Sequence, residues 1–182
     1  MIIIDGTKEI EYDGKTKIAI GKFDGVHLGH RKLISEITDG EKGYKSLVFT
    51  FSYDSLFTYR FDDKLMSEDE RRKLFESLGV DYLVEYKLDK EAASIDPEKF
   101  VKDILIKRLH GAVVVAGADV TFGNRGMGNA DLLKKIADDP DYDFSVKIIE
   151  KVQFKGEDIS SSRIHDAIKE GASSDANDML GL

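Results

Sequence analysis

The chain has 182 residues, 41% of them hydrophobic and 34% charged, which is the balance of a globular domain rather than of a disordered segment. This length suits one domain, residues 1–182, built around one hydrophobic core. A formal net charge of −8, without any block of lysine or arginine, argues against binding nucleic acid through many phosphate contacts. The absence of cysteine excludes disulfides, thiolate metal sites and a cysteine nucleophile, and it fits a reducing compartment.

The first residues, MIIIDG, contain only three consecutive isoleucines before an aspartate. A signal-peptide core or a membrane span needs a longer apolar run. We therefore expect a cytoplasmic protein without a membrane partner.

Residues 16–23 form the first predicted strand, and they run into the stretch GKFDGVHLGH, residues 21–30, which opens a helix. His27 and His30 are three residues apart, so both lie on one face of the first helical turn. Free backbone N–H groups and the positive end of the helix dipole favour an anion at that position. Two imidazole donors would extend this cradle, so the stretch outlines a phosphate site.

The neighbours of the histidines suit the same site, because Gly21 and Gly25 let the backbone approach a ligand closely and Phe23 could cover it from one side. A histidine pair at this spacing is also compatible with an ordinary solvated helix face. A metal pair would need further ligands, which could come only from carboxylates or from His110 and His165. The junction of strand and helix favours a phosphate site over both, so no metal ligand is assigned.

The middle of the chain alternates between strands and helices. Strands are predicted at 46–51 and 81–86 from their β-branched and aromatic residues. The helix between them, residues 67–79, begins with a capping-box pattern at Ser67 and ends at Gly79.

The next predicted helix, residues 96–111, has Asp96 as its N-cap and Pro97 at its first helical position. Its buried stripe has i, i+4 spacing and consists of Val101, Leu105 and Leu109. Gly111 is the predicted end of this helix.

A strand is predicted at 112–117, followed by the glycine-rich stretch AGADVTFGNRGMGN, residues 116–129. Asp119 at the end of this strand could accept hydrogen bonds from ribose hydroxyls, while the glycines let the loop fold against a flat base. A flexible loop between a strand and a helix is an equally good interpretation of the same residues.

The last predicted strand is 144–150, and the stretch ISSSRIH, residues 159–165, opens the helix 160–171 behind it. Successive serines present N–H groups and hydroxyls to an anion, and Arg163 adds a planar, permanently charged fork. A plain N-cap with a spare serine is the alternative. The predicted buried stripe of this helix consists of Ile164, Ala167 and Ile168. Residues 171–180 are compatible with a last short helix.

Because strands and helices alternate, the sequence predicts an α/β fold with a mostly parallel sheet of about five strands. Ligands bind such sheets beyond the carboxyl ends of the strands, which is where all three polar stretches lie.

Taken together, these stretches resemble the FMN adenylyltransferase domain of bacterial bifunctional riboflavin kinase/FAD synthetase, in the nucleotidyltransferase superfamily. GKFDGVHLGH resembles the HxGH signature of that family, ISSSRIH resembles its ISSTRIR motif, and VVVAGADVTFG resembles its VVVGxDFxFG segment. LFESLGVDYLVEY and DPEKFVKDIL resemble its central stretch, so the likeness covers nearly the whole chain in the right order.

The resemblance implies a Rossmann-like, doubly wound sheet of the HxGH type and a reaction in which the phosphate of FMN attacks the α-phosphorus of ATP. FAD and pyrophosphate would be the products, and Mg²⁺ would bridge the ATP phosphates. The implied catalytic residues are His27, His30 and Arg163. The implied ATP-binding residues are Gly21, Phe23, Asp24, Gly25, Asp119, Ser160, Ser161 and Ser162. The implied acceptor-binding residues are Phe51, Asp54, Phe122 and Gly123.

The chain also departs from the family pattern. Tyr53, Asp54 and Ser55 stand where the family has Pro-His-Pro near the flavin phosphate, and His165 stands for the last arginine of ISSTRIR. No riboflavin kinase domain is expected within the 182 residues. Two alternatives therefore stay open: a nucleotidyltransferase for another phosphorylated acceptor, and a non-catalytic module that binds a nucleotide or a flavin.

Overall fold

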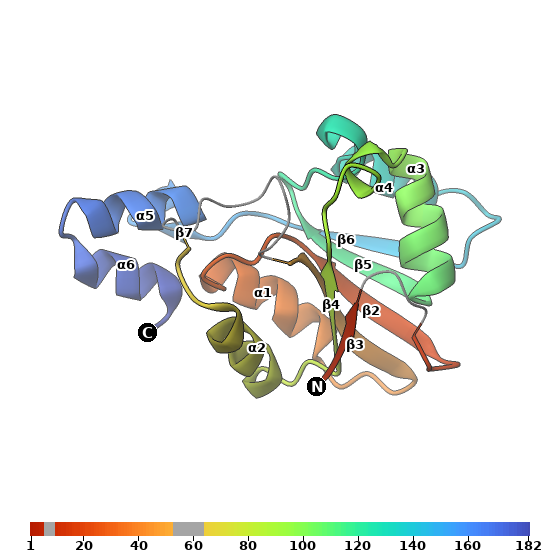
Figure 1. The fold of residues 1–182 in the computed structure, drawn as a ribbon, viewed down its shortest axis with the longest axis horizontal. Coiled ribbons are helices and arrows are strands. Elements are labelled where there is room, and N and C mark those ends of the chain that lie inside the picture. The colour runs from red at the N-terminus through yellow and green to blue at the C-terminus, as the bar shows by residue number, and fades with distance from the viewer. Residues whose placement is uncertain (6–9, 53–63) are drawn as a thin grey trace.

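The computed structural model describes residues 1–5, 10–52 and 64–182. Its centre is a sheet of six parallel strands in the order β1-β4-β3-β2-β5-β6, as Figure 1 shows. The strands are β1 (Ile2–Asp5), β2 (Lys15–Ile20), β3 (Tyr44–Phe51), β4 (Tyr82–Tyr86), β5 (Gly111–Gly117) and β6 (Ser145–Ile149). All five predicted strands are present, and the predicted α/β class is confirmed.

Strand β1 is the sixth strand, which the sequence did not predict. It lies at the edge of the sheet and pairs only with β4, with Ile2 opposite Tyr82. Ile2 and Ile3 are 57% and 48% exposed, so this strand is barely covered. A segment this short, with Ile2 and Ile3 exposed and no alternating pattern, carries little strand signal of its own, and its pairing with β4 defines it as a strand.

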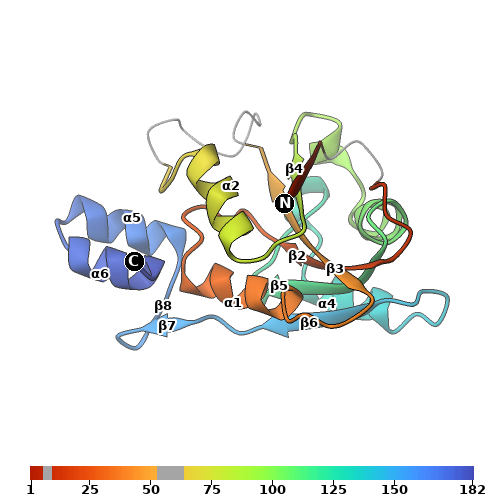
Figure 2. The same cartoon turned by 90° about the horizontal axis from the view of Figure 1, so that it is seen from below.

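Helices cover both faces of the sheet, which confirms the doubly wound architecture (Figures 1 and 2). Successive residues of β2 divide between two cores, because Ile18 and Ile20 face one side and Ala19 faces the other. On the Ala19 side lie α1 (Leu28–Ile37) and α2 (Glu68–Ser77). On the other side lie α3 (Pro97–Lys99), its continuation η3 (Phe100–Arg108) and α4 (Ala130–Ala137).

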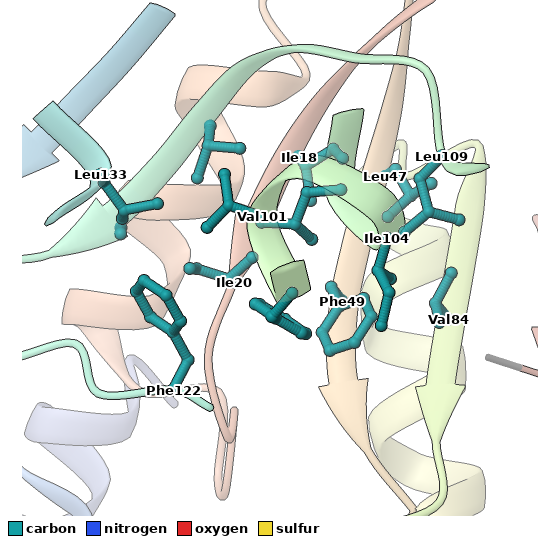
Figure 3. Close-up of a cluster of buried hydrophobic side chains, with 14 of the residues drawn as sticks. Ile18, Ile20, Leu47, Phe49, Val84, Val101, Ile104, Leu109, Phe122 and Leu133 are labelled. Carbon is teal, nitrogen blue, oxygen red and sulfur yellow. The ribbon is translucent and has the colours of Figure 1, made fainter. Parts of the chain in front are cut away.

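Figure 3 shows the larger core, in which Val101 and Ile104 of η3 lie among Ile18, Ile20 and Phe49 of the sheet. Both β2 and β3 are buried along almost their whole length. Because these strands are buried on both faces, the loops that leave their carboxyl ends start from rigid positions.

The segment predicted as one helix from residue 96 begins at the Asp96 N-cap, but most of it is wound as a π-helix. The Leu109 N–H donates to the carbonyl of Ile104 at 3.0 Å, an i to i−5 bond. The predicted stripe of Val101, Leu105 and Leu109 is fully buried. The helix therefore has the predicted position and burial but a different winding, which no residue pattern had indicated.

His110, rather than Gly111, ends this helix. His110 has φ 54° in the left-handed region, and Gly111 is already the first residue of β5. A Cβ atom at Gly111 would lie 2.6 Å from the carbonyl oxygen of Leu105, so the glycine is required by close packing rather than by helix termination.

The two predicted helix ends that carry standard capping signals are confirmed. Ser67 and Glu70 form both bonds of a capping box at the start of α2, and Gly79 behind that helix has φ 82°. Gly171 behind the helix at 160–171 has φ 77°.

The carboxyl-terminal segment forms a small separate cluster beside the sheet (Figure 1). It contains the hairpin β7 (Gln153–Phe154) and β8 (Glu157–Asp158), α5 (Ser161–Lys169) and α6 (Ser173–Leu180). The last short helix is thus confirmed as α6. Ile168, predicted to be buried, is 48% exposed, because the cluster covers α5 on the side of Ile164 only. Within the described ranges, no helix is long and apolar enough to cross a membrane.

Candidate functional site

A cavity of about 500 Å³ lies beyond the carboxyl ends of β2 and β5, where the chain order of the strands reverses. Such a switch point is the usual ligand position in doubly wound sheets. Eight of the residues predicted for catalysis and ATP binding line this cavity: Gly21, Asp24, His27, His30, Asp119, Ser160, Ser161 and Ser162. Residues from three distant stretches of the sequence therefore meet at one place.

The loop between β2 and α1 is strained. Phe23, Gly25 and Val26 all have positive φ, at 51°, 74° and 43°. Left-handed backbone is unfavourable for an aromatic and a β-branched residue, and such strain persists only where the surroundings enforce it. Phe23 and Val26 are fully buried in the core under α1, so the core holds the loop in this shape.

This burial corrects two predictions. Phe23 does not cover a ligand: its ring lies behind the site, 5.0 Å from the His30 ring and 5.6 Å from the Phe75 ring. Gly25 does not line the cavity either, since a Cβ atom there would lie 2.7 Å from the Leu65 side chain. Both residues shape the loop from behind because the apolar core encloses them.

His27 is the N-cap of α1, and its Nδ1 accepts the backbone N–H of His30 at 3.4 Å. With Nδ1 as the acceptor, the neutral ring carries its proton on Nε2. Gly29 leaves room for this ring, since a Cβ atom there would lie 3.2 Å from it. The cap thus fixes the position of His27 at the cavity wall.

His30 stacks on His27, with ring centroids 3.7 Å apart and planes inclined by 17°. Its Nδ1 is buried and finds no hydrogen-bond partner in the part of the chain that the structure describes. The His30 ring thus lies between the rings of His27 and Phe23. The spacing of three residues does bring both imidazoles to one face, as predicted.

Both histidines are uncharged at neutral pH. Burial lowers the pKa of His27 to about 4, although the Asp119 carboxylate acts in the opposite direction. Burial lowers the pKa of His30 well below its ordinary value, and the neighbouring His27 adds a smaller effect in the same direction. As neutral rings they can donate N–H groups to phosphate oxygens, and an approaching anion would favour their protonated forms.

The start of α5 supplies the opposite wall. Ser160 is the N-cap and accepts the backbone N–H of Arg163 at 3.2 Å, while Ser161 Oγ donates to the carbonyl of Asp24 at 3.1 Å. Asp24 is buried, and its carboxylate accepts the Leu65 N–H at 3.2 Å. Asp24 therefore ties the β2–α1 loop to α5.

His165 also belongs to this wall, and its Nε2 lies 3.5 Å from the Asp24 carboxylate. It replaces an arginine of the family motif and keeps a contact with the loop that carries the histidine pair.

Arg163 is not where the motif predicted it. Its guanidinium donates to the carbonyls of Phe154, Glu157 and Asp158 at 2.8 to 3.2 Å, and it lines neither cavity. The three carbonyls of the β7–β8 hairpin satisfy the guanidinium donors, and this hairpin is not recognisable from the motif alone.

Asp119 lines the cavity as predicted, at the end of β5, and its carboxylate lies 3.1 Å from Lys151 Nζ. This pairing raises the pKa of Lys151. Lys151, Glu150 and Lys22 line the cavity but were not predicted. A usable signal existed, since Glu150 is the last residue of the predicted strand 144–150, Lys151 follows it directly, and Lys22 lies inside the histidine motif.

A second cavity of about 240 Å³ adjoins the first and is mostly apolar. Phe51, Phe122 and Gly123 line it, three of the four residues predicted for the acceptor. Asp54, the fourth, lies outside the described residues, as do Tyr53 and Ser55. The remaining wall comes from Tyr86, from the segment around η2 (Ala92–Ser94) and from η4 (Asn124–Gly126).

The loop that bears Phe122 is closed on itself. Phe122 and Gly128 exchange both backbone hydrogen bonds, at 3.1 and 2.9 Å, and the Asn124 N–H donates to the carbonyl of Ile95 at 2.7 Å. The stretch read as either a ligand loop or a flexible connection is therefore a fixed wall of this second cavity.

No group of three or more His, Asp or Glu side chains able to hold a metal is found in residues 1–5, 10–52 and 64–182. The carboxylates of Asp24 and Asp119 line the first cavity but are paired with His165 and Lys151. These donors fit a Mg²⁺ ion that is coordinated mainly by ATP phosphates and water, not one held by a cage of side chains.

Residues 9–163 match the family model of FAD synthetases. The chain is 36% identical over 171 residues to a bifunctional riboflavin kinase/FMN adenylyltransferase of Listeria monocytogenes, which covers 90% of this chain and 53% of that protein. A protein of the same name from Bacillus subtilis is 33% identical over 178 residues, covering 94% and 55%. An FAD synthetase of L. monocytogenes is 28% identical, covering 90% and 68%. The chain spans about half the length of the bifunctional relatives.

Solved structures with a similar fold include two of different identity to this chain. One is a macrolide-efflux protein from Streptococcus pneumoniae, with a TM-score of 0.83 at 26% identity. The match covers 100% of this chain and 60% of the S. pneumoniae chain. The other, a pantoate-beta-alanine ligase from Francisella tularensis complexed with beta-gamma ATP and beta-alanine, has a TM-score of 0.57 at 15% identity, covering 98% and 86%. The second match shows a shared fold only.

Proposed function

The chain belongs to the FAD synthetase family, and from that premise we propose that it transfers the adenylyl group of ATP to FMN, giving FAD and pyrophosphate. One observation carries the proposal: a polar cavity bearing the histidine pair shares a wall with an apolar, aromatic cavity. A nucleoside triphosphate suits the first cavity and a flat flavin ring suits the second.

The reaction needs no nucleophile from the protein. An oxygen of the FMN phosphate forms a bond to the α-phosphorus of ATP, and the bond from that phosphorus to the α,β-bridging oxygen breaks. The electron pair leaves with pyrophosphate. The protein contributes positioning and stabilisation of the developing charge.

On the ATP side, His27 and His30 donate N–H groups to the phosphates from a position fixed by the core. Asp119 accepts from the ribose hydroxyls at the end of β5. Ser160, Ser161 and Ser162 line the same cavity. The hydroxyls of Ser160 and Ser162 bind the far end of the triphosphate, while Ser161, whose hydroxyl donates to the Asp24 carbonyl, positions the start of α5 for this contact. A Mg²⁺ ion held mainly by the ATP phosphates would supply charge neutralisation, which this acidic protein makes more necessary.

On the acceptor side, Phe51 and Phe122 provide flat apolar walls for the isoalloxazine ring. The Phe122 ring packs 5.4 Å from the Phe100 ring, and the closed loop holds its backbone, so this wall is formed before the ligand binds.

We infer a cytoplasmic location from the cysteine-free composition.

The test is incubation with ATP, Mg²⁺ and FMN, followed by chromatography for FAD and a pyrophosphate assay. We expect equal amounts of both products. Riboflavin, which has the ring but no phosphate, is the matched control acceptor and should give no FAD. Pyrophosphate release that ignores FMN but depends on another phosphorylated compound would support the alternative acceptor suggested by Tyr53, Asp54 and Ser55. Binding of FMN and ATP without product would support the non-catalytic module.

A further inference from the structure

The boundary between the two cavities is formed by a small set of residues. Five residues line both: Lys22, Phe51, Phe100, Thr121 and Phe122. Three of them are phenylalanines with apolar rings, and Thr121 carries an uncharged hydroxyl. Lys22 is therefore the only charged residue of the described chain that is common to both cavities.

The backbone of Lys22 is anchored while its side chain is free. Its carbonyl accepts the Thr50 hydroxyl at 2.9 Å and the Arg71 Nη1 at 3.5 Å, and both donors are buried. Lys22 is exposed, and its ammonium group has no ion pair or ring contact in the described ranges. Because its backbone is held in place and its ammonium group is unpaired, the Lys22 side chain is available to bind an anionic ligand.

The other charges of the first cavity do not replace it. Lys151 is paired with Asp119, the histidine pair is neutral, and Glu150 and Asp24 are acidic. Arg125 lines the second cavity but not the first. Among the described residues, Lys22 is thus the one unpaired positive side chain shared by the two cavities in which the two anionic substrates would meet.

We propose that Lys22 binds the phosphate of the acceptor and holds it against the α-phosphate of ATP. The inference rests on the proposed function, because that reaction requires the acceptor phosphate to lie between the ring cavity and the ATP cavity. The ammonium group offsets the repulsion between the two phosphates as the new oxygen to phosphorus bond forms and pyrophosphate departs. Lys22 carries no proton to or from the reacting groups in this role.

The test measures equilibrium binding to the full chain by flavin fluorescence, with FMN and riboflavin compared. In Lys22→Ala we expect the Kd for FMN to rise about tenfold or more, since a charge-assisted hydrogen bond is lost. The Kd for riboflavin should stay within about twofold, because the ring cavity is intact. Lys22→Arg should restore most of the affinity for FMN.

Lys42→Ala is the matched control, because Lys42 is an equally exposed lysine between α1 and β3, at the opposite end of the sheet. It should leave both affinities unchanged. An unchanged Kd for FMN in Lys22→Ala, an equal loss for FMN and riboflavin, or a loss of ATP affinity alone would each overturn the role of Lys22. A parent protein that binds neither flavin would instead contradict the proposed function itself.

Discussion

The starts of α1 and α5 have the same local design but different support. In each, a polar side chain at the N-cap accepts the backbone N–H of the residue three positions later. In α1 the His27 side chain accepts from the His30 N–H, and in α5 the Ser160 side chain accepts from the Arg163 N–H. Helix α1 packs on the sheet within the core, whereas α5 packs on α6 and the hairpin in the small cluster beside the sheet. One of the two turns proposed to bind phosphate is thus built into the core, and the other is attached to it.

The difference shows how tertiary support changes equivalent motifs. The core encloses the first turn, and the resulting burial keeps its two histidines neutral and stacked. In the second turn, Ser160 and Ser161 are half-buried and Ser162 is exposed, and the arginine bonds to the neighbouring hairpin. Asp24 connects the two through Ser161 and His165, and Leu28 at the start of α1 packs against the small cluster that contains α5. We therefore expect the first turn to determine turnover and the second to affect mainly local stability and ATP affinity.

The strongest test is His30→Ala in the first turn. Turnover should fall about a hundredfold or more, because donors to the developing phosphate charge contribute at that scale. The free energy of unfolding should fall by only about 1 kcal/mol from lost ring contacts. Lys32→Ala, an exposed change on the same helix, is the control. Turnover within a few-fold of the parent would show that the histidine pair has no catalytic role.

The pH dependence of stability tests the burial of the same turn. The unfolded His27 binds a proton below about pH 6.5 but the folded one only below about 4, so this residue costs stability as the pH falls through that interval. From pH 7 to pH 5 the parent should lose about 2 kcal/mol relative to His27→Asn, which keeps an N-cap oxygen. Urea unfolding at both pH values measures this. Equal losses in parent and variant would contradict the lowered pKa.

In the second turn, Arg163→Ala should release the hairpin. We expect the free energy of unfolding to fall by about 1 to 2 kcal/mol and hydrogen exchange to accelerate in residues 153–158, while turnover falls less than about tenfold. Lys155→Ala, which removes an exposed pair with Asp175 from the same hairpin, is the control. A loss of turnover as large as that of His30→Ala would mean that Arg163 reaches the reactants once they bind.

The smallest effect is expected from His165→Arg, which restores the family residue. Arginine can contact Asp24 with a planar fork and still present charge to the cavity, so the KM for ATP should fall by about two- to fivefold with kcat unchanged. Steady-state kinetics at neutral pH measure both constants. A variant whose KM equals that of the parent would place residue 165 outside ATP binding.

Much of the sheet was predictable because the signals are local. The strands β2, β3, β4 and β5 are mostly buried and contain apolar runs, whereas β6 alternates between exposed and partly covered residues. Ser67, Asp96 and Gly79 mark helix ends through bonds with near neighbours. The position of the histidine pair was predictable for the same reason, since a spacing of three residues decides a helix face without help from the rest of the fold.

Other features depend on partners that are distant in the sequence. Strand β1 exists through its pairing with β4, and Phe23 lies behind its ligand site because the core under α1 encloses it. Arg163 donates to a carbonyl of the β7–β8 hairpin, and no sequence motif indicates where that hairpin lies. Lys22 lies at the boundary of the two cavities because the fold brings the end of β2 next to the loop of Phe122. The sequence by itself determined the elements and the chemical groups of the site, because these follow from neighbours along the chain. Which of those groups face the ligand was decided by the tertiary structure, because burial and hydrogen-bond partners come from segments far apart in the sequence.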